Sequence, residues 1–307
     1  MKAVITTKCH PILIDRLRQS GYEVSEYPGI KQEALLSLLH DVTGLVVSTG
    51  IRVDVTLLRH APQLKWVGRL GSGLEHIDVS AAAEKNIKVV SSPEGNCDAV
   101  GEHALALLLN LMNRIHISSD EVRKGKWLRE ENRGRELNGL TVGIIGYGNT
   151  GSAFARKLAG FDVQILAYDK YRKNFATDHV KEVALDALLQ KSDVVSMHVP
   201  LTAETLHMAN EVFFASMKRM PWFINTSRGG VHDTKALLFA LEKHQIAGAA
   251  LDVLENEQLE TYTTEEKVQL SALLAHPGVI ITPHIAGYSK EAFYKMSKVL
   301  ADKIGLK

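Results

Sequence analysis

Two side chains that could bind an acid and move a proton each follow a predicted strand in the second half of the chain. Arg228 follows Trp222–Asn225, and its planar guanidinium can grip a carboxylate through two parallel hydrogen bonds, which a lysine cannot match. His284 follows Val279–Thr282, and a histidine can exchange a proton near neutral pH. Each alone could be an ordinary loop residue, but together they offer a carboxylate anchor and an acid–base group.

Glutamates supply a possible partner for the imidazole. Glu255, Glu257 and Glu260 all follow a predicted strand at Ala249–Val253. A carboxylate bonded to an imidazole raises the pKa of the imidazole and favours the imidazolium, the acid that a reduction needs. Spacing alone does not choose among the three. The combination suits reduction of a 2-oxo acid, in which a cation holds the carboxylate, an acid protonates the new alkoxide and a hydride donor lies over the carbonyl carbon.

A glycine-rich segment offers a site for the hydride donor. Gly146-Tyr147-Gly148-Asn149-Thr150-Gly151 follows a predicted strand at Thr141–Ile145 and opens a helical run through Gly160. In that context the first glycine permits a tight turn, the second lets a pyrophosphate approach the backbone, and the third lets helix and strand pack closely. Free N–H groups at the start of the helix then bind the phosphates. The segment therefore predicts a dinucleotide-binding site.

The residues after the next strands indicate which dinucleotide binds. Asp169 follows a predicted strand at Val163–Tyr168. A carboxylate there can accept hydrogen bonds from both ribose hydroxyls of NAD and would repel the 2′-phosphate of NADP. The sequence therefore favours NAD over NADP, although the nearby Arg172 weakens this preference slightly. His198, which opens the segment HVPLT (198–202), suits the adenosine side of the site better than a direct chemical role.

Short β-branched runs alternate with helical patterns and position these residues. The first strands are predicted at Ala3–Thr6, Tyr22–Ser25, Leu45–Ser48, Trp66–Arg69 and Lys88–Ser91, with Asp54 and Asp78 as helix N-caps. A long apolar helix is predicted at Asn96–Ile117, and a polar segment, Ser118–Asn138, reads as surface or subunit contact. The second series, including a strand at Val194–Val199, ends in a helix at Lys290–Ile304. This alternation implies parallel sheets covered on both faces.

The composition narrows the class of protein. The 307 residues are 45% hydrophobic and 23% charged with a formal net charge of +1, which suits two globular domains and gives no electrostatic reason to expect nucleic acid or a membrane as partner. The longest apolar stretch, Ala104–Met112, is too short to span a bilayer, and Met1–Thr6 is too short for a signal peptide. Cys9 and Cys97 form no disulfide framework or metal-ligand spacing, so we expect a cytoplasmic protein without a metal.

The ordered set of motifs resembles the D-isomer-specific 2-hydroxyacid dehydrogenases over nearly the whole chain. The motifs are GRLGSGLEHID (68–78), NCDAVGEH (96–103), GYGNTG (146–151), HVPLT (198–202), NTSRGG (225–230), LDVLENE (251–257) and TPHIAG (282–287), with Asp169 between them. Each motif is only moderately specific, but their order is highly specific. Gln258 stands where the family commonly has proline and Gly101 where alanine is usual, and neither changes a group in the proposed chemistry.

The resemblance implies a fold and a set of roles. It implies an α/β fold with two doubly wound parallel-sheet domains, a Rossmann-type NAD-binding domain at 98–282 and a smaller, discontinuous, flavodoxin-like substrate domain at 1–97 and 283–307. It implies Arg228 as carboxylate anchor and carbonyl polariser, His284 as the acid–base and Glu257 as its partner. Asp252 would orient the nicotinamide. A homodimer joined through the cofactor domains is expected, with 96–117 near the contact.

The binding residues implied in this way form two groups. The NAD site would comprise Gly146, Gly148, Asn149, Thr150, Gly151, Asp169, His198, Pro200, Thr226, Arg228 and Asp252. The substrate site would comprise Arg69 and the backbone of Gly71, Ser72 and Gly73, together with Arg228 and His284.

Within the family the chain is most similar to short D-3-phosphoglycerate dehydrogenases, through GRLGSG (68–73) and ELNG (136–139), which would place it in serine biosynthesis. Arg52 and Arg69 could lie near a substrate phosphate. Ser48, however, stands where such enzymes often carry an arginine, so glyoxylate or hydroxypyruvate reduction is the alternative. The chain ends at Lys307, and we expect no serine-sensing regulatory domain.

Two other functions compete with this interpretation. A formate-dehydrogenase-like activity on the same scaffold is disfavoured, because such enzymes pair the histidine with glutamine where this chain has Glu257. An NADH-sensing, corepressor-like binding protein is not excluded by the residues, since such proteins can retain the same set. The sequence lacks a long flanking tail or peptide-docking segment to support it, and turnover of oxo acids would separate the two.

Overall fold

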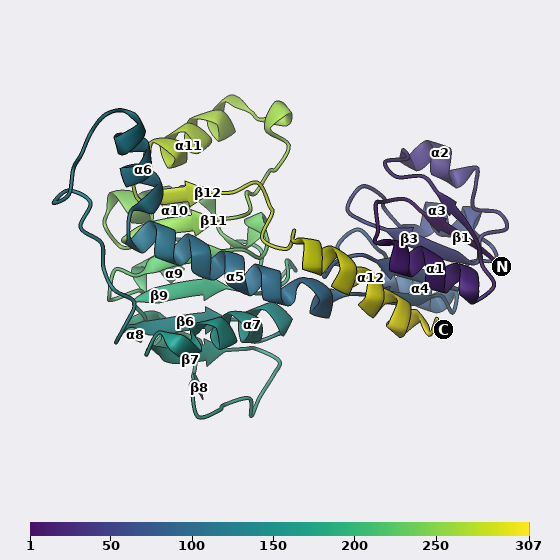
Figure 1. Cartoon of the computed structure of the whole chain (residues 1–307), viewed down its shortest axis with the longest axis horizontal. Helices are drawn as coiled ribbons and strands as arrows, with labels where there is room; N and C mark the ends of the chain where they lie inside the picture. The colour runs from purple at the N-terminus through teal and green to yellow at the C-terminus, as the bar shows by residue number, and fades with distance from the viewer. Residues whose placement is uncertain (307) are drawn as a thin grey trace. The chain divides into compact units, whose positions relative to one another are not determined.

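A computed structural model describes residues 1–306 and divides the chain into two compact units (Figure 1). One comprises Met1–Ala99 with 288–306, and the other comprises Val100–Gly287. The two-domain α/β architecture expected from the alternating pattern is thus confirmed. The assignment of substrate binding to one unit and cofactor binding to the other stays a prediction.

The first unit is a parallel five-stranded sheet with the order β2-β1-β3-β4-β5. Its elements are β1 (Lys2–Ile5), α1 (Pro11–Gln19), β2 (Glu23–Glu26), α2 (Gln32–Leu36), β3 (Gly44–Val47), α3 (Val55–His60), β4 (Trp66–Arg69), α4 (Val79–Glu84), β5 (Lys88–Ser91) and α12 (Lys290–Ile304). The order is that of flavodoxin-like folds. The predicted caps are confirmed, because Asp54 accepts the N–H of Leu57 and Asp78 accepts that of Ala81.

Both faces of this sheet are buried at its central strands β3 and β4, whose residues are all buried, whereas the edge strands β2 and β5 are partly exposed and carry charged residues. Side chains alternate along each strand, so successive residues enter different cores. Val4 packs with α2, α3 and α4 on one face, whereas Ile5 packs with α1 and α12 on the other. The C-terminal helix α12 therefore completes the core of a unit whose strands all come from the first 91 residues.

The second unit is a parallel seven-stranded sheet with the order β12-β11-β10-β9-β6-β7-β8, flanked by helices on both faces. Its elements are β6 (Thr141–Ile145), α7 (Asn149–Lys157), β7 (Gln164–Tyr168), β8 (Val180–Glu182), α8 (Leu185–Lys191), β9 (Val194–Met197), α9 (Glu211–Ala215), β10 (Trp222–Asn225), α10 (Thr234–Glu242), β11 (Gly248–Leu251), α11 (Thr264–Ala275) and β12 (Val279–Ile281). Counting from β6, this is the dinucleotide-binding order 3-2-1-4-5-6 with one further strand. The order reverses between β6 and β9, where a nucleotide is expected to bind.

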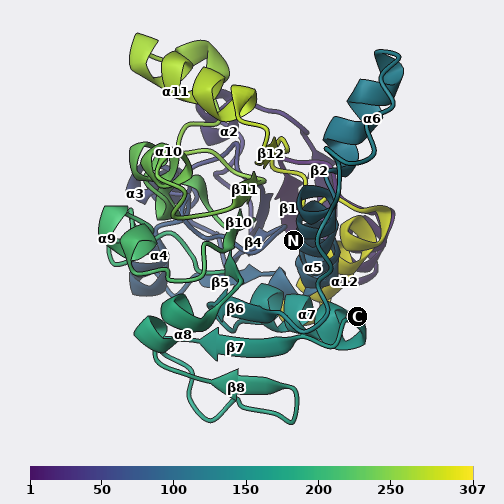
Figure 2. The same cartoon turned by 90° about the vertical axis from the view of Figure 1, so that its left-hand side faces the viewer.

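Two cores sandwich this second sheet, and each central strand feeds both. Ile145 and Phe223 pack with α8, α9, α10 and Leu273 of α11, whereas the neighbouring residues Ile144 and Ile224 pack with α5 (Pro93–Met112) and α7. Figure 2 shows α5 and α7 on one side of the strands and α8, α9 and α10 on the other. The sheet is therefore held rigidly from both faces, and the loops at its carboxyl edge start from fixed positions.

The structure departs from the sequence-based expectations in two places. The predicted helix Asn96–Ile117 is wrong in its bounds, because α5 ends at Met112 and a separate helix, α6 (Ile115–Arg123), begins after Arg114. Arg114 has φ +53°, a left-handed conformation that cannot continue a right-handed helix. The edge strand β8 is not among the predicted strands, and α6 extends into the segment Ser118–Asn138, for which the sequence predicts surface or subunit contact. Within residues 1–306, no helix combines the length and apolar character needed to cross a membrane.

Candidate active site

Three loops leave the carboxyl ends of three adjacent parallel strands in the second unit. Arg228 follows β10, Glu257 follows β11 and His284 follows β12. The register pairs Asn225 with Leu251 and Leu251 with Ile281, so the last residues of the three strands lie side by side. The topology therefore brings together at one edge residues that are separated by up to 56 positions in the chain (228 to 284).

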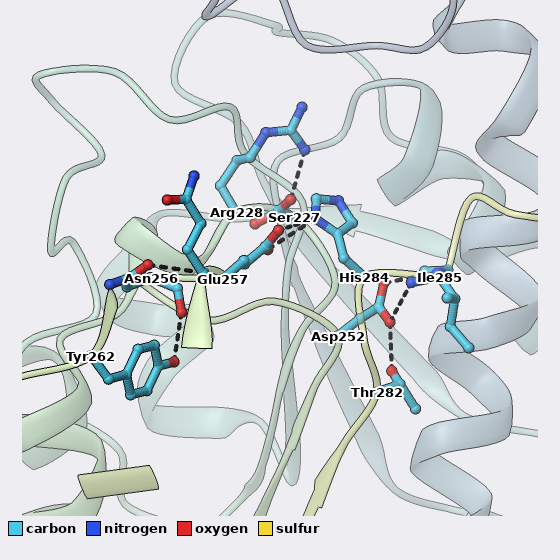
Figure 3. A network of polar contacts seen from close by, with 11 residues as sticks. Ser227, Arg228, Asp252, Asn256, Glu257, Tyr262, Thr282, His284 and Ile285 are labelled. Atoms are coloured by element: carbon cyan, nitrogen blue, oxygen red, sulfur yellow. Dashed lines mark hydrogen bonds and ion pairs between the residues drawn. The ribbon is translucent and has the colours of Figure 1, made fainter. Parts of the chain in front are cut away.

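His284 and Glu257 form a hydrogen-bonded pair (Figure 3). Nδ1 of His284 lies 2.9 Å from both carboxylate oxygens of Glu257, and the two side chains are 42% and 44% exposed. The pair is thus open to a ligand while each partner orients the other. Of the three glutamates considered from the sequence, Glu257 is the one that contacts His284, whereas Glu255 bonds His207 at 2.6 Å.

Asp252 holds the loop that carries His284. It is completely buried, and one of its oxygens accepts the N–H of Ile285 and the hydroxyl of Thr282 while the other accepts the N–H of Ala286. Burial alone would raise the pKa of Asp252, but these hydrogen bonds and one from His103 outweigh it, so the pKa is lowered and the group is a carboxylate. His284 itself has φ +54°, a backbone conformation that residues other than glycine rarely adopt. The loop is therefore kept in a strained shape by a buried anion.

The Arg228 loop is folded by the buried Asn225 and packs against the Glu257 loop. The Asn225 amide donates to the Arg228 carbonyl at 2.9 Å, and its oxygen accepts the N–H of Ser227. A Cβ added at Gly229 would lie 1.8 Å from the carbonyl oxygen of Leu254, so these two backbones touch. Arg228 is half-buried and donates to the carbonyl of Ser227 at 2.7 Å. This packing places the arginine loop and the glutamate loop in one cluster.

The glycine-rich turn has the geometry that its spacing predicts. Gly146 has φ +91°, and a Cβ there would lie 2.5 Å from the carbonyl oxygen of His198. A Cβ at Gly151 would lie 2.0 Å from the carbonyl oxygen of Gly146, whereas a Cβ at Gly148 would meet nothing within 4 Å. The first and third glycines thus serve packing, and the second leaves open space at the start of α7, where free N–H groups favour an anion.

Asp169 is tied to this turn. Its carboxylate accepts the backbone N–H groups of Tyr147 at 2.9 Å, Tyr171 at 2.9 Å and Arg172 at 2.8 Å. Burial would raise its pKa, but these three donors and the charge of Arg172 outweigh that effect and lower it. A carboxylate has about four lone-pair sites, so capacity remains for a ribose hydroxyl.

The other residues predicted to bind the cofactor differ in their burial and in whether their polar atoms already have hydrogen-bond partners. His198 is buried beside Phe154, bonds Ser196 at 2.8 Å and has its pKa lowered to about 3 by burial, so it is neutral and not an acid–base group. Thr226 is buried with a hydroxyl that has no hydrogen-bond partner within the described chain. Such a group usually has a partner, and a bound ligand would supply one. Asn149, Thr150 and Pro200 are exposed or half-exposed.

Comparisons with known proteins agree with this geometry. Residues 105–286 match the family model described as "D-isomer specific 2-hydroxyacid dehydrogenase, NAD binding domain". The chain belongs to the D-isomer specific 2-hydroxyacid dehydrogenase family. The matched residues cover most of the second unit and include its glycine-rich turn, its Asp169 and its His284–Glu257 pair, so this unit contains the NAD-binding domain of the family member.

Individual relatives of this dehydrogenase-family chain carry different names. A D-3-phosphoglycerate dehydrogenase of Archaeoglobus fulgidus is 34% identical over 306 residues, which are 99% of this chain but 56% of the relative, so the chain spans about half of its length. A glyoxylate reductase of Thermofilum pendens is 37% identical over 91% of this chain and 82% of the relative. The crystal structure of D-lactate dehydrogenase from Aquifex aeolicus complexed with NAD and lactic acid is 30% identical with a TM-score of 0.85, covering 99% of this chain and 94% of that one.

The residues predicted to bind substrate from the first unit lie at the end of β4. Arg69 is buried and donates to the carbonyl of Leu70, and its guanidinium lies 3.0 Å from the place of a Cβ on Gly71. Gly71 has φ +128°, and its N–H is held by Ser92 at 3.1 Å. Ser72 is exposed and Gly73 half-exposed. Their role in substrate binding stays a prediction.

Some residues of this family member's site were not assigned a role from the sequence. His103 on α5 bonds the Thr282 hydroxyl at 3.0 Å and lies 3.5 Å from Asp252. Thr282 in turn donates to Asp252 at 2.5 Å. Both were seen only as parts of motifs, because a hydrogen bond that joins positions 103 and 282 leaves no spacing signal in one sequence.

Proposed function

We propose that this chain is an NAD-dependent oxidoreductase that transfers a hydride between nicotinamide and C2 of a D-2-hydroxy acid or 2-oxo acid. The observation that carries the proposal is the His284–Glu257 pair with its 2.9 Å contacts, beside the Arg228 loop at the carboxyl edge of the sheet. An imidazole with a carboxylate on one nitrogen can carry a proton on the other to a substrate oxygen. A buried or isolated histidine could not do this.

The residues present fit the cofactor. The open space at Gly148, the free N–H groups of α7, the remaining acceptor capacity of Asp169 and the unpartnered Thr226 hydroxyl would hold the pyrophosphate, ribose and nicotinamide ends of NAD. We propose NAD as the preferred form, because Asp169 would repel a 2′-phosphate. The bound cofactor supplies or accepts the hydride.

This chain's own groups perform the rest of the reaction. Arg228 would bind the carboxylate of a 2-oxo acid through paired hydrogen bonds and polarise its carbonyl. Glu257 stabilises the imidazolium of His284, which gives its proton to the carbonyl oxygen as C2 receives the hydride, so that one oxo acid, one hydride and one proton yield one hydroxy acid. In the reverse direction the neutral imidazole accepts the hydroxyl proton.

For the acid itself we propose D-3-phosphoglycerate and 3-phosphohydroxypyruvate first, because Arg52 is exposed after β3 and Arg69 ends the adjacent β4. The burial of Arg69, which is only 8% exposed, favours the alternative of glyoxylate or hydroxypyruvate, whose side chains carry no phosphate. We further propose a cytoplasmic homodimer, because both cysteines are unpaired and Trp127 is 78% exposed on the segment after α6. A monomer in sedimentation equilibrium would contradict the dimer.

The test is NADH oxidation with 3-phosphohydroxypyruvate, hydroxypyruvate, glyoxylate and pyruvate, for the wild type and His284→Ala. We expect turnover of at least one acid and a loss of roughly 10²-fold or more in the variant, with NADH affinity little changed, because only the proton donor is removed. Near-normal turnover of His284→Ala would remove His284 from the mechanism. Tight NADH binding without turnover of any acid would favour the NADH-sensing alternative instead.

A further inference from the structure

The loop that carries Glu257 is held by polar contacts of the two residues before it, Glu255 and Asn256. Glu255, two positions before, accepts the backbone N–H of Thr234 at 2.8 Å on one oxygen and lies 2.6 Å from Nε2 of His207 on the other. These contacts attach the first half of the loop to the start of α10 and to the segment before α9.

Asn256 is the second residue that attaches this loop to the rest of the unit, and it does so through both its side chain and its backbone carbonyl. Its side-chain amide donates to the Thr261 hydroxyl and to the Glu266 carboxylate, both at 3.1 Å. Its backbone carbonyl accepts the Tyr262 hydroxyl at 2.6 Å (Figure 3). Asn256 and Glu257 are joined by one peptide unit, so the Tyr262 bond acts directly on the carbonyl of the peptide whose N–H belongs to Glu257.

A cavity lies under the same stretch of loop. It has a volume of about 310 Å³, and Leu254, Glu255, Asn256 and Tyr262 are among the residues that line it, whereas Glu257 is not. The loop is therefore not backed there by close-packed side chains, which normally fix a backbone. Its position depends on the polar contacts across the cavity instead.

We propose that Tyr262 is a positioning residue of this enzyme: its hydroxyl, by holding the Asn256 carbonyl, keeps the Glu257 carboxylate against His284. The inference rests on the proposed function and deepens it, since it assigns a residue that stabilises the proton-carrying form of His284. Without this bond the loop can relax toward the cavity, and the carboxylate spends less time within 2.9 Å of the imidazole.

The charged surroundings are consistent with a hydroxyl that stays a donor. Burial, and then the carboxylates of Glu266, Glu257 and Glu255, raise the pKa of Tyr262, so it is protonated throughout the neutral range. Glu257 bonds the ring of His284 and Asp252 holds its loop, with His103 3.5 Å from Asp252 and Arg228 on the neighbouring loop. Tyr262 contacts the loop of Glu257, whereas Asp252 and the Arg228 loop are held by other contacts, so we expect a change at Tyr262 to reach the imidazole through Glu257.

The experiment compares Tyr262→Phe with the wild type and with Tyr27→Phe, a tyrosine of the first unit that is 39% exposed. The ring that lines the cavity is kept in Tyr262→Phe and only the hydroxyl is lost. kcat/KM for oxo-acid reduction is measured from pH 6 to pH 9.5, with NADH affinity measured separately. Since one hydrogen bond contributes on the order of 1 kcal/mol, we expect about a fivefold loss on the alkaline side.

The diagnostic result is a change in the pH profile. We expect the alkaline limb of Tyr262→Phe to move to lower pH by up to about 0.7 unit, the logarithm of that fivefold change, with little loss at pH 6 and unchanged NADH affinity. Glu257→Gln should move the same limb further, and Tyr27→Phe should not move it. Asn256→Ala keeps the carbonyl that accepts from Tyr262 but removes three side-chain hydrogen bonds, to Thr261, to Glu266 and from the N–H of Gln258. It gives a second reading if Tyr262→Phe is poorly folded, and it should move the limb in the same direction.

The outcomes separate this inference from the proposed function. A limb that moves with Glu257→Gln but not with Tyr262→Phe or Asn256→Ala overturns the positioning role and leaves the enzyme intact. An equal loss of kcat/KM at every pH would show that Tyr262 acts only on folding and also overturns it. Absence of turnover in the wild type overturns the proposed function itself.

Discussion

Replacing Asp252 by asparagine should loosen the loop that carries His284. The amide keeps one acceptor oxygen but presents N–H groups in place of the other oxygen. With the amide oxygen toward Thr282 and Ile285, its NH₂ faces the N–H of Ala286, which the carboxylate now binds at 2.7 Å. Turned the other way, the NH₂ faces the N–H of Ile285, held at 2.9 Å. In both orientations the side-chain NH₂ therefore faces a buried backbone N–H, and neither group can accept a hydrogen bond from the other.

The loss of stability expected for Asp252→Asn follows from these contacts. Loss of a hydrogen bond to a charged group costs about 1.5–3 kcal/mol, and a buried N–H left unsatisfied costs about 1–3 kcal/mol more. Because Asp252 is fully buried, water does not screen the effect. We expect Asp252→Asn to lose about 3–5 kcal/mol of the free energy of unfolding, the range found when one member of a buried charged contact is removed. His284 should also leave its left-handed conformation, which non-glycine residues keep only at a cost of about 1–3 kcal/mol.

Urea unfolding followed by circular dichroism, together with kcat for oxo-acid reduction, measures both effects. We expect kcat to fall by roughly 10²-fold, since the imidazole is displaced from the position it needs. Thr282→Val is the matched control, because it keeps the shape of the side chain and both backbone N–H bonds to Asp252 but removes the hydroxyl, and it should cost about 1.5–3 kcal/mol. If Asp252→Asn unfolded within 1 kcal/mol of the wild type and kept its kcat, the buried carboxylate would not be what holds the loop.

Two further predictions concern the glycine-rich turn and the buried histidines. Gly151→Ala should destabilise the protein by about 1–3 kcal/mol, because its Cβ would lie 2.0 Å from the Gly146 carbonyl oxygen. Gly148→Ala should fold normally but bind NADH at least tenfold more weakly, because its Cβ would enter the open space at the turn. Equal urea midpoints for the two variants would contradict this prediction. The pKa of His198 is lowered to about 3 and that of His232 to about 4, both below the unfolded value of about 6.5, so the unfolded chain binds protons that the folded chain does not. Stability should therefore be full above pH 6.5 and fall by up to about 1.4 kcal/mol per pH unit per histidine between about pH 6 and 4.5; His198→Gln should reduce that slope, and a flat profile would refute the assignment.

Much of the fold was predictable because its strands are strongly patterned. Buried parallel strands such as Thr141–Ile145 are short apolar runs between turn residues, and β6 has the predicted bounds. The edge strand β8 (Val180–Glu182) was missed, because two of its three residues are charged and it carries no run to detect. The end of α5 was missed because Asn113-Arg114 contains neither glycine nor proline, although Arg114 adopts φ +53°.

The site was predictable in its residue types but not in its contacts. Spacing could not choose among Glu255, Glu257 and Glu260, since all three follow the same strand. The tertiary structure distinguishes two of these glutamates. Glu255 is hydrogen-bonded to His207 and Thr234, whereas Glu257 is hydrogen-bonded to His284. The roles of His103 and Tyr262 depend on partners 179 and 6 positions away, and neither separation marks a motif.

The position of α12 has a consequence for how the chain is made. Leu300 and Ala301 of this helix belong to the same buried cluster as Ala3, Ile5 and Trp66, and Leu300 packs against the backbone of Gly68. During synthesis the first five strands emerge early, yet α1 alone covers one side of their sheet until the ribosome has finished everything from Val100 to Gly287. The later unit therefore has the opportunity to fold first, and the earlier one completes its core only after α12 has been made.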